Sequence, residues 1–406
     1  LQVGDQVAAA EGGSGILASA WTTSPKKVLY MIARFADETG FPETLSIANS
    51  RMTEVANYFQ ATSWGQTTMT WEAIEIVLPK NKADYSPEAN RPYILMADAR
   101  AAAAALDPQY ASANWDLDAV RFNVAYSGGW LGQGIQGGKG VWIQNNIPGV
   151  AIHEFGHNYG LAHANFWNTS DTSVIGAGVD QGYGDPFSTM GASTKLGQFS
   201  PYEKWLLGWI PTSNIQTITS SGTYRVYTAD SATAPSGTSM YGLRITKDSE
   251  RDYWISHRRQ FASTNKWAQD GVFLHWDPWN IPGVGSAGGT QLLDTTPGTA
   301  QGKNDAPLVR GRTFSDTAAN IHITPMTLNT GTIPISMDVV VKMGPFPGNR
   351  VPTVSLTANL TSVAPGANVS FTATAADADG DALAVYWDFG DESFASNTLT
   401  ITKTLS

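Results

Sequence analysis

The segment H-E-F-G-H-N-Y-G-L-A-H, residues 153–163, decides the fold of the region around it. It holds three of the six histidines in the 406-residue chain, in the pattern H-E-x-x-H-x-x-G-x-x-H. Residues four apart on a helix share a face, so we expect His153 and His157 to direct their imidazoles to one point. Gly160 permits the left-handed turn that ends such a helix and brings His163 to the same point.

This spacing predicts a catalytic zinc site. Three neutral imidazole nitrogens, from His153, His157 and His163, leave a tetrahedral Zn²⁺ with one open position, which distinguishes a catalytic site from a structural one. Glu154 stands beside the first ligand, where its carboxylate reaches a water molecule on the metal without binding the metal itself. We therefore expect one zinc ion, with Glu154 as the catalytic base. The alternative is a helix whose histidines are ordinary surface or core residues.

A second segment, Tyr183-Gly-Asp-Pro-Phe-Ser-Thr-Met190-Gly191, follows in a polar, glycine-rich stretch. A long zinc motif followed by such a methionine turn resembles the metzincin clan of metalloproteases. The resemblance implies that Met190 is a structural residue of a Met-turn, a hydrophobic floor below the ligands and not a ligand itself.

The residues around the three histidines indicate which family of the clan the sequence resembles. The stretches 157–165 and 202–209, with Ala164 directly after the third histidine, are similar to the gametolysin-like (M11) peptidases. Gametolysin itself carries Gln in place of the first histidine, whereas His153 is retained here. Astacins and serralysins have a zinc- or oxyanion-binding Tyr at the position of Ala192, so that role is vacant or filled elsewhere. The resemblance covers roughly residues 27–210.

Composition limits the classes of protein that the chain represents. Apolar residues make up 42% and charged residues 15%, which describes a globular protein with well-buried cores. The formal net charge of −10 argues against nucleic acid as a partner. The sequence contains no run of about 20 apolar residues, so we expect no helix that spans a membrane. There are no cysteines, and therefore no disulfides, thiolate metal ligands or cysteine nucleophile.

Hydrophobic periodicity predicts an α+β fold with several parts. Strand and helix patterns alternate before the zinc motif and predict a mixed sheet with helices, which is also what the metzincin resemblance implies. Short alternating segments between residues 212 and 343 predict an antiparallel β-sandwich. The expected parts are an N-terminal arm or propeptide remnant (1–26), a zinc protease domain (27–211), the β-sandwich (212–343), a Pro/Gly linker (344–352) and a C-terminal module (353–406).

The C-terminal module resembles a PKD domain, an immunoglobulin-like sandwich. The residues that carry the resemblance are the stretches 377–381 (D-A-D-G-D) and 387–391 (W-D-F-G-D). The chain stops short of the last strands of such a sandwich, so we expect a truncated module. Asp377, Asp379 and Asp381 have a spacing compatible with a structural Ca²⁺, but a glycine turn is favoured because no acidic residue follows at the spacing of an EF-hand.

The resemblance implies a substrate that lies as an extra strand on a sheet edge above the zinc helix. We expect this edge at residues 138–144, with Gly138, Gly140, Val141 and Trp142 in contact with the peptide. The predicted function is a secreted, extracellular zinc endopeptidase, of bacterial origin because of the C-terminal module, acting on a protein or peptide such as extracellular matrix or a cell-wall glycoprotein. Two alternatives stay open: a zinc amidase acting on cell-wall or glycoprotein substrates, and a non-catalytic secreted adhesion protein.

Overall fold

The computed structural model describes residues 19–85, 91–123, 130–191, 197–259, 269–277, 289–345, 350–391, 393–396 and 398–405. Residues 1–18 of the expected N-terminal arm and Ala192 lie outside the described residues. The described end of the arm packs against the folded chain: Thr22 is buried, and its hydroxyl donates to the carbonyl of Leu207 (2.9 Å).

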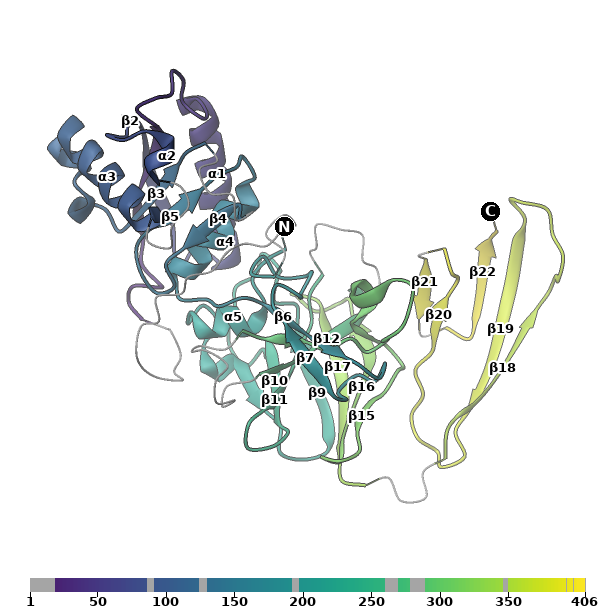
Figure 1. The fold of residues 1–406 in the computed structure, drawn as a ribbon. Coiled ribbons are helices and arrows are strands. Elements are labelled where there is room, and N and C mark those ends of the chain that lie inside the picture. Colours follow the sequence, from purple (N-terminus) through teal and green to yellow (C-terminus); the bar gives the residue numbers. More distant parts are fainter. Residues whose placement is uncertain are drawn as a thin grey trace.

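A five-stranded sheet forms the first part of the fold (Figure 1). Its order is β2-β1-β3-β5-β4, and only β4 is antiparallel to its neighbour, so the sheet is mixed, as its sequence predicted. Its strands are β1 (Lys26–Arg34), β2 (Met69–Val77), β3 (Leu117–Arg121), β4 (Gly132–Gly134) and β5 (Val141–Ile143).

Helices cover both faces of this sheet. Alternate residues of β1 enter two different cores: Val28 and Tyr30 pack with α1 and α4, whereas Leu29 and Met31 pack with α3. Parallel strands buried on both faces are expected to be apolar along their buried length, as β1 is from Val28 to Ala33. The helices are α1 (Leu45–Thr62), α2 (Lys82–Tyr85), α3 (Arg91–Leu106) and α4 (Pro148–Asn158), with short 3₁₀ turns at Pro108–Tyr110 and Ser112–Asn114.

The prediction that residues 138–144 form an edge strand is wrong. Strand β5 lies inside the sheet, parallel to β3 on one side and antiparallel to β4 on the other. Val141 and Trp142 are fully buried. The sequence did not indicate β4, because its three residues, Gly-Gln-Gly, show no apolar alternation. Among the described residues, β4 is the edge of the sheet on this side.

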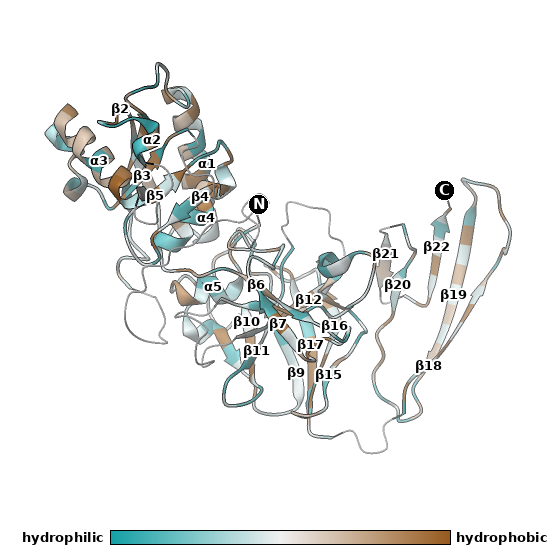
Figure 2. Cartoon of the chain, in the orientation of Figure 1, coloured by the Kyte–Doolittle hydropathy of each residue, from teal (hydrophilic) through white to brown (hydrophobic). Residues whose placement is uncertain are grey.

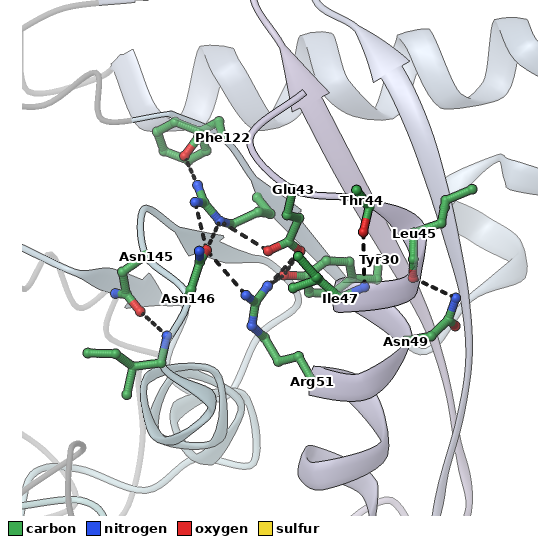
Figure 3. A network of polar contacts seen from close by, with 12 residues as sticks. Tyr30, Glu43, Thr44, Leu45, Ile47, Asn49, Arg51, Phe122, Asn145 and Asn146 are labelled. Carbon is green, nitrogen blue, oxygen red and sulfur yellow. Dashed lines mark hydrogen bonds and ion pairs between the residues drawn. The ribbon is translucent and has the colours of Figure 1, made fainter. Parts of the chain in front are cut away.

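A buried polar network lies where the chain leaves the sheet and enters α4 (Figure 3). Arg51 donates to Glu43 (2.6 Å) and to the hydroxyl of Tyr30. Arg51 and Arg121 both donate to the side-chain oxygen of Asn146, at 3.3 and 2.9 Å, immediately ahead of the helix. Because Arg51 lies on α1 and Arg121 on β3, their shared contact with Asn146 ties the start of α4 to both elements.

The second part is a β-sandwich. An eight-stranded sheet, in the order β7-β6-β13-β12-β11-β10-β8 with β14 beside β12, faces a four-stranded sheet in the order β15-β16-β17-β9. Apolar residues of both sheets, such as Ile255, Leu274, Ile323 and Val339, form one core. The strands of the larger sheet are β6 (Asn165–Thr169), β7 (Gly178–Gln181), β8 (Ile215–Thr217), β10 (Gly242–Thr246), β11 (Asp252–Ser256), β12 (Gly271–Asp277), β13 (Gln291–Leu292) and β14 (Leu308–Val309). Those of the smaller sheet are β9 (Gly222–Tyr227), β15 (Phe314–Asp316), β16 (Ile321–Asn329) and β17 (Ser336–Met343).

The sandwich differs from its sequence prediction in two ways. It is not wholly antiparallel, because β8 is parallel to β10 and β6 is parallel to β13. Its larger sheet also includes β6 and β7, which come from the stretch directly after His163. These strands are only five and four residues long, N-F-W-N-T and G-V-D-Q, so period-two alternation did not reveal them. Helix α5 (Pro201–Leu206) and 3₁₀ turns at Thr212–Asn214 and Gly302–Asp305 complete this part.

The C-terminal strands form two small sheets of their own, at the end of the chain (Figure 1). They are β18 (Thr353–Ala358), β19 (Asn368–Ala376) and β22 (Thr400–Thr404) in one sheet, and β20 (Tyr386–Asp388) with β21 (Phe394–Ser396) in the other. Both sheets are antiparallel, and apolar and polar residues alternate along β19 (Figure 2).

The D-A-D-G-D stretch forms a turn. The side-chain oxygen of Asp377 accepts from the backbone N–H groups of Asp379 (2.8 Å) and Asp381 (3.1 Å), which is an Asx turn. Asp379 is paired with Arg350 (2.8 Å). Among the described residues, no helix has both the length and the apolar character that a membrane crossing requires.

We predict that the linker at 344–352 is a cleavable joint. In the part of the chain that the structure describes, no strand of the C-terminal module pairs with a strand before residue 343, so the module is not needed to complete either earlier sheet. Limited proteolysis should release a fragment of roughly residues 1–345 that keeps its thermal midpoint. A fragment that unfolds on release would show that the module is part of the same cooperative unit.

Candidate metal centre

Helix α4 carries the first part of the site and is buried along its length. Pro148 occupies its first turn, where the missing N–H costs nothing, and every residue from Gly149 to Asn158 is buried. Although the helix is buried, Figure 2 shows hydrophilic residues on it. The helix ends at Asn158, and Gly160, two residues later, makes the expected turn with a φ of 105°, in the left-handed region. A buried helix with histidines inside it needs polar partners for them.

The structure brings the three histidines together. One ring nitrogen from each of His153, His157 and His163 lies within 4.8 Å of the others, and they are the only such group of potential metal ligands among the described residues. The Nε2 atoms of His153 and His157 are 3.1 Å apart. Two nitrogens that share one tetrahedral zinc ion, each at about 2.1 Å, lie roughly 3.4 Å apart, so the observed separation suits a common ion.

Backbone carbonyls fix the tautomers of both helical histidines. Nδ1 of His153 is 2.8 Å from the carbonyl oxygen of Thr189, and Nδ1 of His157 is 2.7 Å from that of Leu161. Because a carbonyl oxygen only accepts, each Nδ1 donates a proton, and each Nε2 keeps its lone pair. Two lone pairs that face each other at 3.1 Å repel, whereas a cation between them attracts both. This donor set fits a divalent metal ion such as zinc.

Burial keeps the three imidazoles neutral. Desolvation, followed by the charge of a neighbouring histidine, lowers the pKa of His153 to about 3. Desolvation lowers the pKa of His157 to about 4. Desolvation and both neighbouring histidines hold the pKa of His163 far below its usual range. At neutral pH the rings are therefore unprotonated, which is the state that binds a metal.

Met190 lies directly against the helix. A Cβ added to Gly156, between the two helical ligands, would come 2.5 Å from the Met190 sulfur, so a larger residue there would displace the methionine side chain. The methionine is fully buried, and its carbonyl accepts from the backbone N–H of Ala164 (3.1 Å), next to His163. The adjacent residue, Thr189, supplies the carbonyl that orients His153. This turn therefore contacts the helix, the first histidine and the chain beside the third.

Strand β4 crosses close to Glu154. A Cβ on Gly132 would lie 2.7 Å from the Glu154 carboxylate, and a Cβ on Gly134 would lie 2.4 Å from the Glu154 backbone oxygen. Glu154 is fully buried beneath the strand. The two glycines thus allow the sheet edge to approach the helix at Glu154, the residue predicted from the sequence to be the base.

The sandwich forms the other side of the site. The backbone N–H of Asn165 donates to Thr290 (2.7 Å), and a Cβ on Gly289 would lie 1.8 Å from the carbonyl oxygen of His163. A buried pair joins Asp185, in the segment before Met190, to His275 of β12 (3.0 Å). The sequence gives no signal for these contacts, because residues 90 or more positions apart in the chain carry no pattern that links them.

The residues predicted for the substrate strand have other places. Trp142 donates from its indole to the carbonyl of Pro92 (2.7 Å) in the core on the far side of the sheet. Val141 lies in the core around α4. The carbonyl of Gly140 accepts from the side chain of Asn158 (3.1 Å) and so braces the end of α4, whereas a Cβ on Gly138 would meet only Ile135.

Comparison with known proteins assigns one part of the chain. Residues 353–404 match the family model of the PKD domain, which confirms the resemblance seen at the C-terminus. No curated protein matches the chain. The C-terminal module is thus a PKD domain.

The close approach at Gly132 yields a stability prediction. Gly132→Ala places a methyl group against the Glu154 carboxylate and Val150, so the strand or the side chain must move. Overpacking of this kind costs about 1–3 kcal/mol of unfolding free energy, measured by denaturant unfolding. Gly40→Ala is the control, because an added Cβ there meets nothing within 4 Å. Equal stability of the two variants would contradict the close packing of β4 on α4.

Proposed function

We propose that this chain is a zinc-dependent endopeptidase of the metzincin type, similar to the gametolysin-like peptidases. The observation that carries the proposal is the convergence of His153, His157 and His163 beside the buried Glu154. Three neutral nitrogen ligands and an adjacent carboxylate are the set that hydrolytic zinc sites use. The contact of Met190 with Gly156, between the two helical ligands, adds a feature that metzincins share.

The chemistry divides between the ion and the chain. A zinc ion held by the three imidazoles supplies Lewis acidity, which polarises the scissile carbonyl and lowers the pKa of a water molecule. Glu154 accepts the proton from the attacking water and passes it to the leaving amine. The carbonyls of Thr189 and Leu161 keep the imidazoles of His153 and His157 oriented, and the close approach of β4 limits the space around the Glu154 carboxylate. No covalent bond between substrate and enzyme is required.

The substrate lies along β4 in this proposal. Gln144 donates to the carbonyl of Leu131 and Ile135 donates to that of Gly140, so odd-numbered residues of this strand face β5. In an antiparallel ladder the alternate residues, Gly132 and Gly134, then direct their N–H and C=O groups away from the sheet. An extended peptide pairs with such groups wherever its ends lie, which favours internal cleavage. The strand passes over Glu154, close to the proposed chemistry.

Two other functions remain as alternatives. A zinc amidase acting on cell-wall or glycoprotein substrates uses the same residues on another substrate, and a non-catalytic adhesion protein uses none of them. The PKD domain supports an extracellular, secreted location, because such domains occur in extracellular proteins. Digestion of casein and of purified cell-wall peptides, each with and without a chelator, distinguishes the three functions.

Separate variants test the metal and the base. The full chain should bind one zinc ion, and His157→Ala should lose it because a ligand is removed. Glu154→Gln should retain zinc but lower kcat by about 100-fold or more, because the proton acceptor is gone. Zinc content is measured by metal analysis and kcat with a fluorogenic peptide. Near-normal turnover in Glu154→Gln would remove Glu154 from the role of base.

The cleavage mode can be tested with a blocked peptide. A long unstructured peptide blocked at both ends should be cut internally, because an unpaired sheet edge recognises backbone and not chain termini. Mass spectrometry of the products identifies the bonds that are cut, and Glu154→Gln serves as the inactive control. Stepwise trimming of free peptide, with no cutting of the blocked one, would show an exopeptidase instead.

A further inference from the structure

Tyr183 has an unusual backbone conformation. Its φ is 57°, in the left-handed region that large side chains rarely adopt. Its neighbours are Gly182 and Gly184. Glycine can adopt the left-handed region without steric cost, yet neither of these two glycines has a φ in that range. The strain therefore falls on the one residue of the three that has a side chain to place.

The Tyr183 ring lies against the histidine cluster. Its centroid is 3.7 Å from that of His163, with the planes inclined by 38°, and 5.8 Å from that of His153, with the planes inclined by 22°. His163 and His153 are themselves stacked at 5.3 Å. His163 is the candidate ligand that follows the end of the helix, so α4 does not itself determine the orientation of its ring.

The backbone around Tyr183 is held from the sandwich. Its N–H donates to the side-chain oxygen of Asn165 (3.2 Å), two residues after His163. The Asn165 amide donates to Asp180 (2.8 Å), and Asp180 also accepts from Gln291 of β13 (2.8 Å). Asn165 thus connects the third histidine, the turn at Tyr183 and the larger sheet in one set of hydrogen bonds.

We propose that Tyr183 is a positioning residue whose aromatic ring holds His163, and through it the ligand cluster, in the orientation that binds the metal. This role rests on the proposed zinc site. It assigns the function to the ring face that contacts His163 and not to the phenol hydroxyl. A strained backbone persists where the surrounding structure enforces it, and such strain concentrates at functional sites. Residues that orient metal ligands typically change metal affinity by 10- to 100-fold when they are removed.

Tyr183→Gly removes the ring at a position where glycine adopts the backbone conformation without strain, so the variant should keep its fold. Its dissociation constant for Zn²⁺, measured by competition with a chromophoric chelator, should nevertheless rise by about 10-fold or more. A tyrosine that only filled space would give lower stability and unchanged metal affinity.

Two further variants complete the test. Tyr183→Phe keeps the ring, so its zinc affinity and the visible spectrum of its Co²⁺ form should match the wild type. Thr172→Gly is the matched control, because Thr172 also has a positive φ of 59°, on the loop between β6 and β7. It should likewise keep its fold, with no change in zinc affinity.

The outcomes separate the ring from the hydroxyl and from the site as a whole. Wild-type affinity in Tyr183→Gly overturns the positioning role while the zinc site stands. Equal loss in Tyr183→Phe and Tyr183→Gly assigns the effect to the hydroxyl and also overturns it. A wild-type chain that binds no Zn²⁺ overturns the proposed function, and the positioning role with it.

Discussion

Three neutral imidazoles converging in a buried site are the constraint on which the surrounding structure depends. Two nitrogen lone pairs face each other at 3.1 Å, an arrangement that is unfavourable unless the rings are held from behind. The carbonyls of Thr189 and Leu161 hold them, and these carbonyls belong to the turn before Met190 and to the end of α4. The helix cannot be placed independently of that turn, because Gly156 and Met190 are in van der Waals contact.

Polar contacts also fix the start of α4. The ion-pair network of Glu43, Arg51 and Arg121 reaches Asn146 just before the helix begins. At the other end, Asn158 donates to the carbonyl of Gly140, so the helix is tied to the sheet at both termini. Between these points β4 passes over Glu154 at a distance that only glycine permits. A carboxylate enclosed in this way has little freedom, which suits the role of proton acceptor that we propose for Glu154.

The sandwich is continuous with the site and not an appendage to it. Strands β6 and β7 leave the histidine cluster and enter the larger sheet beside β13. The pair of Asp185 and His275 joins the same sheet to the segment before Met190. Desolvation raises the pKa of Asp185, but the contacts with His275, Arg258 and the backbone of Phe187 together leave it lowered. Any movement of this sheet would therefore move the third histidine. The PKD domain, by contrast, has strands that pair only with one another within the described residues.

The sequence by itself determined the local features of this protein. The i, i+4 spacing of His153 and His157, the turn at Gly160, the apolar strand β1 and the PKD domain at the C-terminus all followed from residues close together in the chain, whose geometry is set by backbone periodicity. The tertiary structure alone decided which strand lies at the sheet edge, that β6 and β7 join the sandwich, and that Tyr183 lies on His163. Strand order depends on pairing between distant segments, and short strands such as Gly132–Gly134 carry too few side chains to encode it. Backbone carbonyls such as that of Thr189 have no residue signature at all, so their role is visible only when the chain is folded.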